Sequence, residues 1–355
     1  MTMVAERNGG ALFDSVGVVR SFGAHVVALV FTGDDAVAAA LGDGHVVFAP
    51  TASDGTPRRV RAHDGVCLTM RSDIEPGRLL SGGDDGRLAS VGVDGSVRDL
   101  VAVPGAWVDP IATAPATHLR AAAIGRSVIL LGSDGSRLAT FEHDHTVAGL
   151  TFDPKGRRLA ASSYGGTFLW WANVEPQTPK RLRWPGSHLE TVWSPDGRFV
   201  VSAMQENALH GWRLADRADM RMAGYSVKVR SMAWLSKGRY LATGGSEGVV
   251  CWPFHGKDGP MGKSPLDLGW GLDALVTVVA PHPCHDLVAA GYEDGTTILA
   301  FLDRAIPVLV HRGGEGAVSA LAWSDDGRRF AIGTEGGLLA VARLEDWRAP
   351  RRRTD

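Results

Sequence analysis

The stretch Val229–Trp252, VRSMAWLSKGRYLATGGSEGVVCW, decides the predicted fold. Apolar and polar residues alternate from Val229 to Trp234 and again from Tyr240 to Thr243. A Gly-rich turn at Ser246–Gly248 then leads into a third apolar run. Alternation with a period of two, bounded by clusters of Gly, Ser and charged residues, is typical of short antiparallel strands. The stretch therefore predicts three consecutive strands.

The same pattern recurs along the chain. Eight apolar alternations open at Val26, Val66, Val108, Val147, Leu189, Val229, Leu275 and Val318. Their spacing averages about 42 residues, a period expected of four-stranded propeller blades. Turns rich in Asp, Pro and Gly follow the first strand of most units, for example at Asp153–Gly156, Ser194–Gly197 and Ser324–Gly327. Asp-Gly or Glu-Gly then separates two apolar runs, which is the strongest short-range signal for a hairpin.

A large aromatic residue closes the third strand of several units, at Phe48, Trp170, Trp212 and Trp252. With these features the chain resembles the WD40-repeat β-propellers from about Val18 to Leu344. The family's terminal Trp-Asp pair is absent, and no unit carries the family's complete Ser/Thr–His–Asp–Trp set. Unit two has Ser81, His63 and Asp85, but Ser90 stands in place of the Trp. We therefore expect irregular blades within a propeller.

The resemblance implies an all-β fold, a single closed β-propeller. The repeat count predicts eight four-stranded blades, with seven as the alternative. The last unit has only three strands, and we expect the N-terminal strand Val18–Phe22 to complete it and close the ring. The predicted organisation is a flexible N-terminal tail over residues 1–17, the propeller over 18–345 and a basic C-terminal tail over 346–355. The tail's three arginines suggest a frayed end or, alternatively, a weak hook for nucleic acid or an acidic partner.

Composition narrows the class of protein. The chain has 355 residues, 45% of them hydrophobic, with 45 glycines and a net charge of −2. That charge gives no field to attract nucleic acid or an anionic membrane. The cysteines Cys67, Cys251 and Cys284 are widely spaced and suggest free thiols in a reducing compartment. No signal peptide or membrane-spanning run is evident, so we expect a cytoplasmic protein. A closed propeller has no strands to share with a second copy, so we expect a monomer.

Imidazole and aromatic side chains precede the inner strand of most units. A propeller places these loops on one face, around the mouth of its central channel. Mixed with acidic neighbours, such residues are typical of a partner-binding hot spot. We predict that a protein or peptide binds through His25, His63, Trp107, His145, His188, Tyr225 and Trp270. The WD40 resemblance offers an alternative for His63 and His143, in which each ring is a structural hydrogen-bond partner.

A zinc site is the second prediction for this face, because imidazole suits zinc and an open mouth leaves room for water. Its ligands would come from His63, His143, His145 and His188. No other cofactor is expected. The cluster His282–His285 is interpreted as a turn on the opposite face. No G-x-S-x-G, H-E-x-x-H or P-loop motif occurs, so we expect a non-enzymatic scaffold. A propeller enzyme acting at the channel mouth is the remaining alternative.

Overall fold

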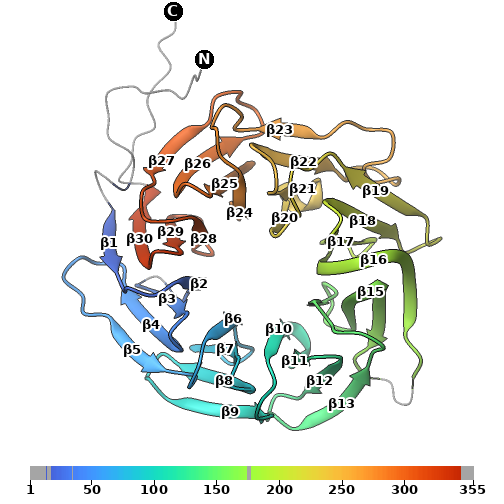
Figure 1. Ribbon diagram of the computed structural model, residues 1–355, viewed down its shortest axis with the longest axis horizontal. Helices are drawn as coiled ribbons and strands as arrows, with labels where there is room; N and C mark the ends of the chain where they lie inside the picture. The colour runs from blue at the N-terminus through green and yellow to red at the C-terminus, as the bar shows by residue number, and fades with distance from the viewer. Residues whose placement is uncertain (1–12, 14–16, 34, 174–176, 345–355) are drawn as a thin grey trace, which may run out of the picture.

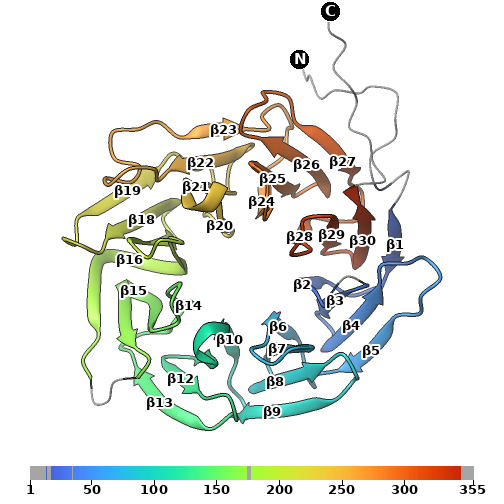
Figure 2. The ribbon, with the colours of Figure 1, turned by 180° about the vertical axis from the view of Figure 1, so that it is seen from behind.

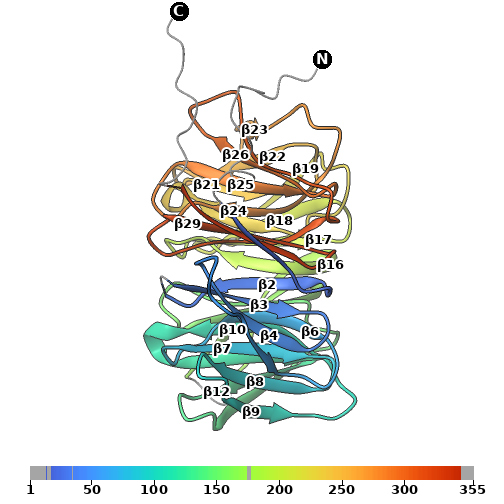
Figure 3. The same cartoon turned by 90° about the vertical axis from the view of Figure 1, so that its left-hand side faces the viewer.

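The computed structural model describes residues 13, 17–33, 35–173 and 177–344, and its strands form a closed ring around a central axis (Figure 1). Figure 2 shows the ring from behind, and Figure 3 shows that it is a flattened disc. Two short 3-10 turns, η1 (Pro115–Thr117) and η2 (Ser236–Gly238), lie between strands. The two predicted tails lie almost wholly outside the described residues.

Six sheets of the ring contain four antiparallel strands each. Three of them are β2 (Val26–Phe31), β3 (Ala36–Leu41), β4 (His45–Pro50), β5 (Arg58–Arg61); β6 (Cys67–Ser72), β7 (Arg78–Gly83), β8 (Arg87–Gly92), β9 (Val97–Ala102); and β10 (Val108–Ala114), β11 (Leu119–Ile124), β12 (Ser127–Leu131), β13 (Arg137–Glu142). The other three are β20 (Met232–Leu235), β21 (Tyr240–Thr243), β22 (Val249–Pro253), β23 (Leu266–Leu268); β24 (Val276–Pro281), β25 (Leu287–Tyr292), β26 (Thr296–Phe301), β27 (Val308–Arg312); and β28 (Val318–Trp323), β29 (Arg329–Thr334), β30 (Leu338–Arg343) with β1 (Val18–Ser21). The first strand of each repeat is the innermost, and in the closing sheet the N-terminal strand β1 is the outermost (Figure 1).

The seventh sheet has six strands, and we call it the double sheet. Its strands are β14 (Gly149–Phe152), β15 (Arg158–Trp171), β16 (Lys180–Trp193), β17 (Phe199–Met204), β18 (Ala208–Arg213) and β19 (Asp219–Ala223). The first part of β15 pairs with β14 and its second part with β16, while the second part of β16 pairs with β17. The double sheet thus spans the two repeats that open at Val147 and Leu189.

The prediction of eight separate four-stranded blades is therefore wrong, and the alternative number, seven, describes the sheets. The cause lies in β15 and β16, which run for 14 residues each through positions where the sequence suggested turns. Gly165 and Gly166 adopt φ values of 82° and 138°, and the register shifts there without ending the strand. Hydrogen bonding consequently continues from one repeat into the next.

Closure of the ring follows the prediction. Strand β1 pairs antiparallel with β30, with Val18 opposite Val341. Phe13, which lies in the predicted tail, is buried, and its ring centroid is 6.2 Å from that of Phe330. The N-terminal strand therefore completes the three-stranded final unit.

The apolar core is divided among the contacts between neighbouring sheets. Trp170 of the double sheet stacks on Phe141 of β13, with centroids 4.6 Å apart and planes at 11°. This is the wedge position predicted for the aromatic residue of the third strand. Burial of such large rings between sheets supplies much of the stabilisation of a propeller.

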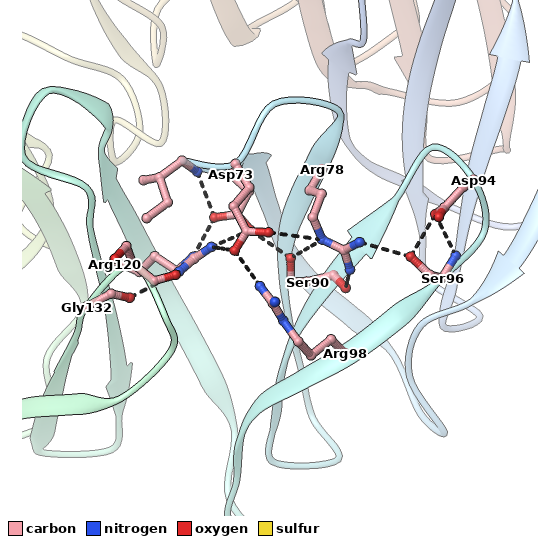
Figure 4. A network of polar contacts seen from close by, with 11 residues as sticks. Asp73, Arg78, Ser90, Asp94, Ser96, Arg98, Arg120 and Gly132 are labelled. Atoms are coloured by element: carbon pink, nitrogen blue, oxygen red, sulfur yellow. Dashed lines mark hydrogen bonds and ion pairs between the residues drawn. The ribbon is translucent and has the colours of Figure 1, made fainter.

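A buried polar network replaces the aromatic wedge where Ser90 stands in place of the Trp (Figure 4). The fully buried Arg120 of β11 donates from Nε to Asp73 Oδ1 at 2.5 Å and from Nη2 to Glu75 Oε1 at 2.7 Å. Ser90 Oγ donates to Asp73 Oδ2 at 2.7 Å and accepts from Arg78 Nε at 2.8 Å. Because Arg120 and Asp73 belong to neighbouring sheets, the network ties unit two to unit three.

Candidate functional site

The predicted partner-binding residues fall into two groups. His63, His188 and Tyr225 are buried, with exposed fractions of 0%, 1% and 8%. The other four are exposed, namely His25, Trp107, His145 and Trp270. These four lie in loops that join the outermost strand of one sheet to the innermost strand of the next, so they share one face of the disc, which we call the loop face.

His63 is a structural residue. Its Nδ1 donates to Asp85 Oδ1 at 3.0 Å, and its Nε2 lies 2.9 Å from Ser81 Oγ. Asp85 also accepts the backbone N–H groups of Asp64 and Arg87, at 3.0 and 3.1 Å. Burial lowers the pKa of His63 because the charged imidazolium loses its hydration. These contacts match the structural role that the WD40 resemblance implied.

Tyr225 occupies the corresponding place in unit six, which has no histidine. Its hydroxyl lies 2.8 Å from Thr243 Oγ1 and accepts from Trp252 Nε1 at 2.6 Å. His188 is similarly enclosed, with Nδ1 2.6 Å from Ser202 Oγ and Nε2 donating to the Trp184 carbonyl at 3.0 Å. We therefore remove His63, His188 and Tyr225 from the predicted partner-binding set, since their polar atoms are engaged inside the sheets.

The two groups differ in one residue of the second strand of the unit to which each side chain belongs. The fourth residue of that strand carries a hydroxyl in the units of the buried rings, as Ser81, Ser202 and Thr243. It is alanine in the units of the exposed side chains, as Ala39, Ala122, Ala161 and Ala290. A hydroxyl gives a buried ring a hydrogen-bond partner, whereas alanine gives none. This signal is readable in the sequence, but our prediction did not use it.

The predicted zinc ligands do not converge. His143 Nε2 accepts from Trp170 Nε1 at 3.1 Å, His63 and His188 make the contacts given above, and His145 packs against Tyr164. Within the described ranges, no group of three or more His, Cys, Asp or Glu side chains is arranged to hold a metal ion. The structure therefore does not bring the predicted zinc ligands together, because three of the four rings take part in separate sets of hydrogen bonds.

The cluster His282–His285 forms a turn, as interpreted. His282 is buried, its Nδ1 accepts the N–H groups of Cys284 and His285 at 3.0 Å each, and its Nε2 donates to the Gly327 carbonyl at 3.0 Å. Cys67, Cys251 and Cys284 are free thiols, and only Cys284 is exposed.

A groove of about 650 Å³ opens on the loop face beside His145, and we call it the His145 groove. The His145 and Tyr164 rings meet edge to face, with centroids 5.3 Å apart, and Tyr164 is 54% exposed. Ser163 Oγ donates to the carbonyls of His145 and Thr146 at 3.1 and 2.9 Å, which fixes the loop. The lining is Arg126, Asp144, His145, Thr146, Ala148, Tyr164, Ser187, His188 and Leu189. The groove thus offers a cation, a carboxylate, an aromatic wall and apolar surface.

Two carboxyl groups on the innermost strands have raised pKa values. Burial raises the pKa of Glu190 to about 7, and Glu190 Oε2 is inaccessible and has no hydrogen-bond partner among the described residues. Burial of its carboxyl group also raises the pKa of Asp109 to about 6, although the residue as a whole is exposed. The charge of Arg71 opposes both shifts. Both carboxyl groups therefore titrate near neutral pH.

The ring of sheets is a β-propeller, and its repeats are similar to those of the WD40 family. The profile of that family, described as WD domain, G-beta repeat, matches residues 135–171 and 220–252 and confirms the resemblance. Within the described chain, no helix has the length and hydrophobicity needed to cross a membrane.

Two curated relatives match parts of the chain. The rice (Oryza sativa subsp. japonica) "Chromatin assembly factor 1 subunit FAS2 homolog" is 29% identical over 196 residues, which covers 52% of this chain and 35% of the rice protein. The mouse (Mus musculus) "Serine-threonine kinase receptor-associated protein" is 22% identical over 242 residues, covering 68% of this chain and 66% of the mouse protein. The chain therefore spans about a third of the first relative and just under two thirds of the second.

A solved structure supports the fold. The crystal structure of the computationally designed Ika8 protein superimposes with a TM-score of 0.74 at 18% identity, covering 94% of this chain and 100% of the designed protein. At that identity the likeness concerns the fold alone.

Proposed function

We propose that the protein is a non-enzymatic scaffold that binds a protein or peptide partner through the loop face. The observation that carries the proposal is the exposure of large aromatic side chains there. Trp107 is 67% exposed, Trp270 is 51% exposed and Tyr164 is 54% exposed. Exposed Trp and Tyr side chains of this kind are enriched among the residues that dominate binding energy in protein interfaces.

The surrounding structure favours binding without a large loss of entropy. The loops start from sheets that are closed into a ring, and His63 and Tyr225 anchor two of the loops by buried hydrogen bonds. A partner that meets a preorganised surface loses less free energy to ordering. The His145 groove adds Arg126 and Asp144, which can fix the orientation of a bound peptide.

The proposal assigns no catalytic residue. His25 and His145 make no nucleophile–base hydrogen bond with any described side chain, whereas such a pair is the starting point for acyl transfer or hydrolysis. The names of the two relatives refer to chromatin assembly and to association with a kinase receptor, and a scaffold role agrees with both. The free cysteines and the closed ring fit the further proposal of a cytoplasmic monomer.

Affinity purification from native extract tests the proposal. We expect wild type to retain a stoichiometric protein partner and the double variant Trp107→Ala/Trp270→Ala to lose it. Ile306→Ala is the matched control, because Ile306 is 51% exposed between β26 and β27 on the opposite face. Equal recovery of the same partner by both variants, or the absence of any stoichiometric partner, would contradict the proposal.

A further inference from the structure

A second groove, of about 520 Å³, lies on the face opposite the loop face. We call it the Trp171 groove. It opens between β13 and the double sheet, where the turn after β10 meets the turn after β14 and the end of β15. Its wall is largely apolar and includes Leu119, Leu138, Phe141 and Trp171. The volume falls within the range of about 300–1,000 Å³ that is usual for ligand-sized clefts.

Two large apolar side chains stay exposed at the rim of this groove. Leu138 is 49% exposed and Trp171 is 50% exposed, whereas Phe141 is 3% exposed and lies at the floor. Leu138 and Trp171 come from neighbouring sheets and face the same space. Exposed apolar side chains that border a cleft are among the features of ligand-binding sites.

Hydrogen bonds fix the shape of the Trp171 groove. The backbone N–H of Trp171 donates to Gln177 Oε1 at 2.8 Å, and Gln177 Nε2 donates to the Trp171 carbonyl at 2.6 Å. Thr117 Oγ1 donates to the Gly156 carbonyl at 3.0 Å and so joins the turns of the two sheets. Gly156 has a φ of +65°, and a Cβ there would lie 2.5 Å from Thr117 Oγ1. The two walls are therefore held at a set separation before any ligand arrives.

The charge of the groove selects the chemistry of the occupant. Arg157 is the charged residue of the lining, and the exposed Lys155 lies two residues before it in the same turn. Arg158 Nε lies 3.0 Å from Asp153 Oδ2, but no ion pair joins Arg157 to another residue in the described part of the chain. An unpaired guanidinium beside apolar surface is complementary to a carboxylate that follows or precedes a large apolar side chain.

We propose that the Trp171 groove docks a segment of a partner protein in which a bulky apolar side chain stands next to Asp or Glu. The apolar side chain fills the space between Leu138 and Trp171, and the carboxylate pairs with Arg157. This surface is separate from the loop face, so the protein can hold two partner segments at once. The inference does not depend on the function proposed for the loop face.

Fluorescence anisotropy with labelled ten-residue peptides tests the proposal. The probe carries a central Leu-Phe pair flanked by Asp residues, and two matched peptides carry Asn or Lys in place of Asp. We expect the Asp peptide to bind the full chain, and the Asn and Lys peptides to bind at least about tenfold more weakly. Arg157→Glu should reverse this order, and Trp171→Ala should weaken all binding.

The controls show whether the peptides bind in the Trp171 groove or elsewhere on the chain. Trp107→Ala/Trp270→Ala should bind the Asp peptide as wild type does, and circular dichroism should show that every variant is folded. The proposal is overturned if no peptide binds up to about 1 mM, or if Arg157→Glu leaves the order of the peptides unchanged. Sedimentation is the last arm: a dimer that Leu138→Asp dissociates would assign the groove to a second copy of the chain and also overturn the proposal.

Discussion

Glu190 lies on the innermost part of β16, and its side chain is only partly accessible to solvent. Its Oε2 atom is inaccessible and lacks a hydrogen-bond partner within the described residues, so burial raises the pKa of Glu190 to about 7. The charge of Arg71 lowers this pKa but does not offset the burial. The unperturbed value is about 4.3. Ionisation of Glu190 therefore lowers the free energy of unfolding.

Glu190→Gln should stabilise the protein in alkaline solution. The folded pKa lies above the unfolded one, so the folded state binds more protons between pH values of about 4.3 and 7, and stability falls as pH rises through that window. We expect the glutamine variant to gain on the order of 1–3 kcal/mol in the free energy of unfolding at high pH, and little near the lower limit. Urea unfolding of both proteins at alkaline and at mildly acidic pH measures the difference. An identical difference at both pH values would contradict the assignment.

At the scale of the strand and the sheet, the sequence predicts regular elements well and their connections less well. The expected strand Tyr240–Thr243 is β21, and β1 closes the last sheet as expected. The double sheet was missed because Gly165 and Gly166 have the composition of a turn, while their positive φ values let β15 continue. The bond between Arg120 and Asp73 was also missed, since side chains 47 positions apart carry no local pattern.

Arg120→Met should strongly destabilise the junction between units two and three. In wild type, burial favours the neutral form of Asp73, but hydrogen bonds from the Arg120 guanidinium outweigh it and lower the pKa of that carboxyl group. The variant leaves the buried carboxylate without its cation. Loss of one partner from a buried ion pair costs about 3–5 kcal/mol. Thermal or urea unfolding measures the change.

Arg98→Met is the matched control, because Arg98 is an exposed residue at the outer edge of the same network and pairs with the half-exposed Glu75. A surface ion pair contributes about 0–1 kcal/mol. The double variant Arg120→Met/Asp73→Asn should recover part of the lost stability. If Arg120→Met costs no more than Arg98→Met, the network in Figure 4 does not tie the units together.

At the scale of the whole ring, the sequence predicts where the loop face lies but not which of its side chains are exposed. The repeat period places the loops on one face, and Trp107, His145 and Trp270 are exposed there. The same period cannot show that Tyr225 and His188 turn inward to Thr243 and Ser202. That difference depends on one hydroxyl in the adjacent strand. The Trp171 groove was not predicted either, because Leu138 and Trp171 belong to different sheets.

Stability of the ring should fall in mild acid. Burial lowers the pKa values of His63, His143, His188, His210 and His282, that of His210 to about 4. Below a pH of about 6.5 the histidines of the unfolded chain bind protons, whereas those of the folded protein stay neutral. The free energy of unfolding therefore decreases as the pH falls toward the folded pKa values.

For each histidine that is protonated only in the unfolded chain, the free energy of unfolding falls by about 1.4 kcal/mol per unit decrease in pH. Glu190 and Asp109 act in the opposite direction, so the measurement uses the variant Glu190→Gln/Asp109→Asn, in which neither group titrates. We expect the urea midpoint to drop steadily between neutral pH and mildly acidic pH. A midpoint that does not change over this range would show that the rings are not held neutral.

Hydrogen exchange of the chain with and without its purified partner tests most directly whether the loop face is the binding surface. We predict that the partner slows exchange in the loops at residues 103–107, 143–148 and 269–275, which carry Trp107, His145 and Trp270. Protection confined to the turns of the opposite face, with these loops exchanging as in the free protein, would contradict the account.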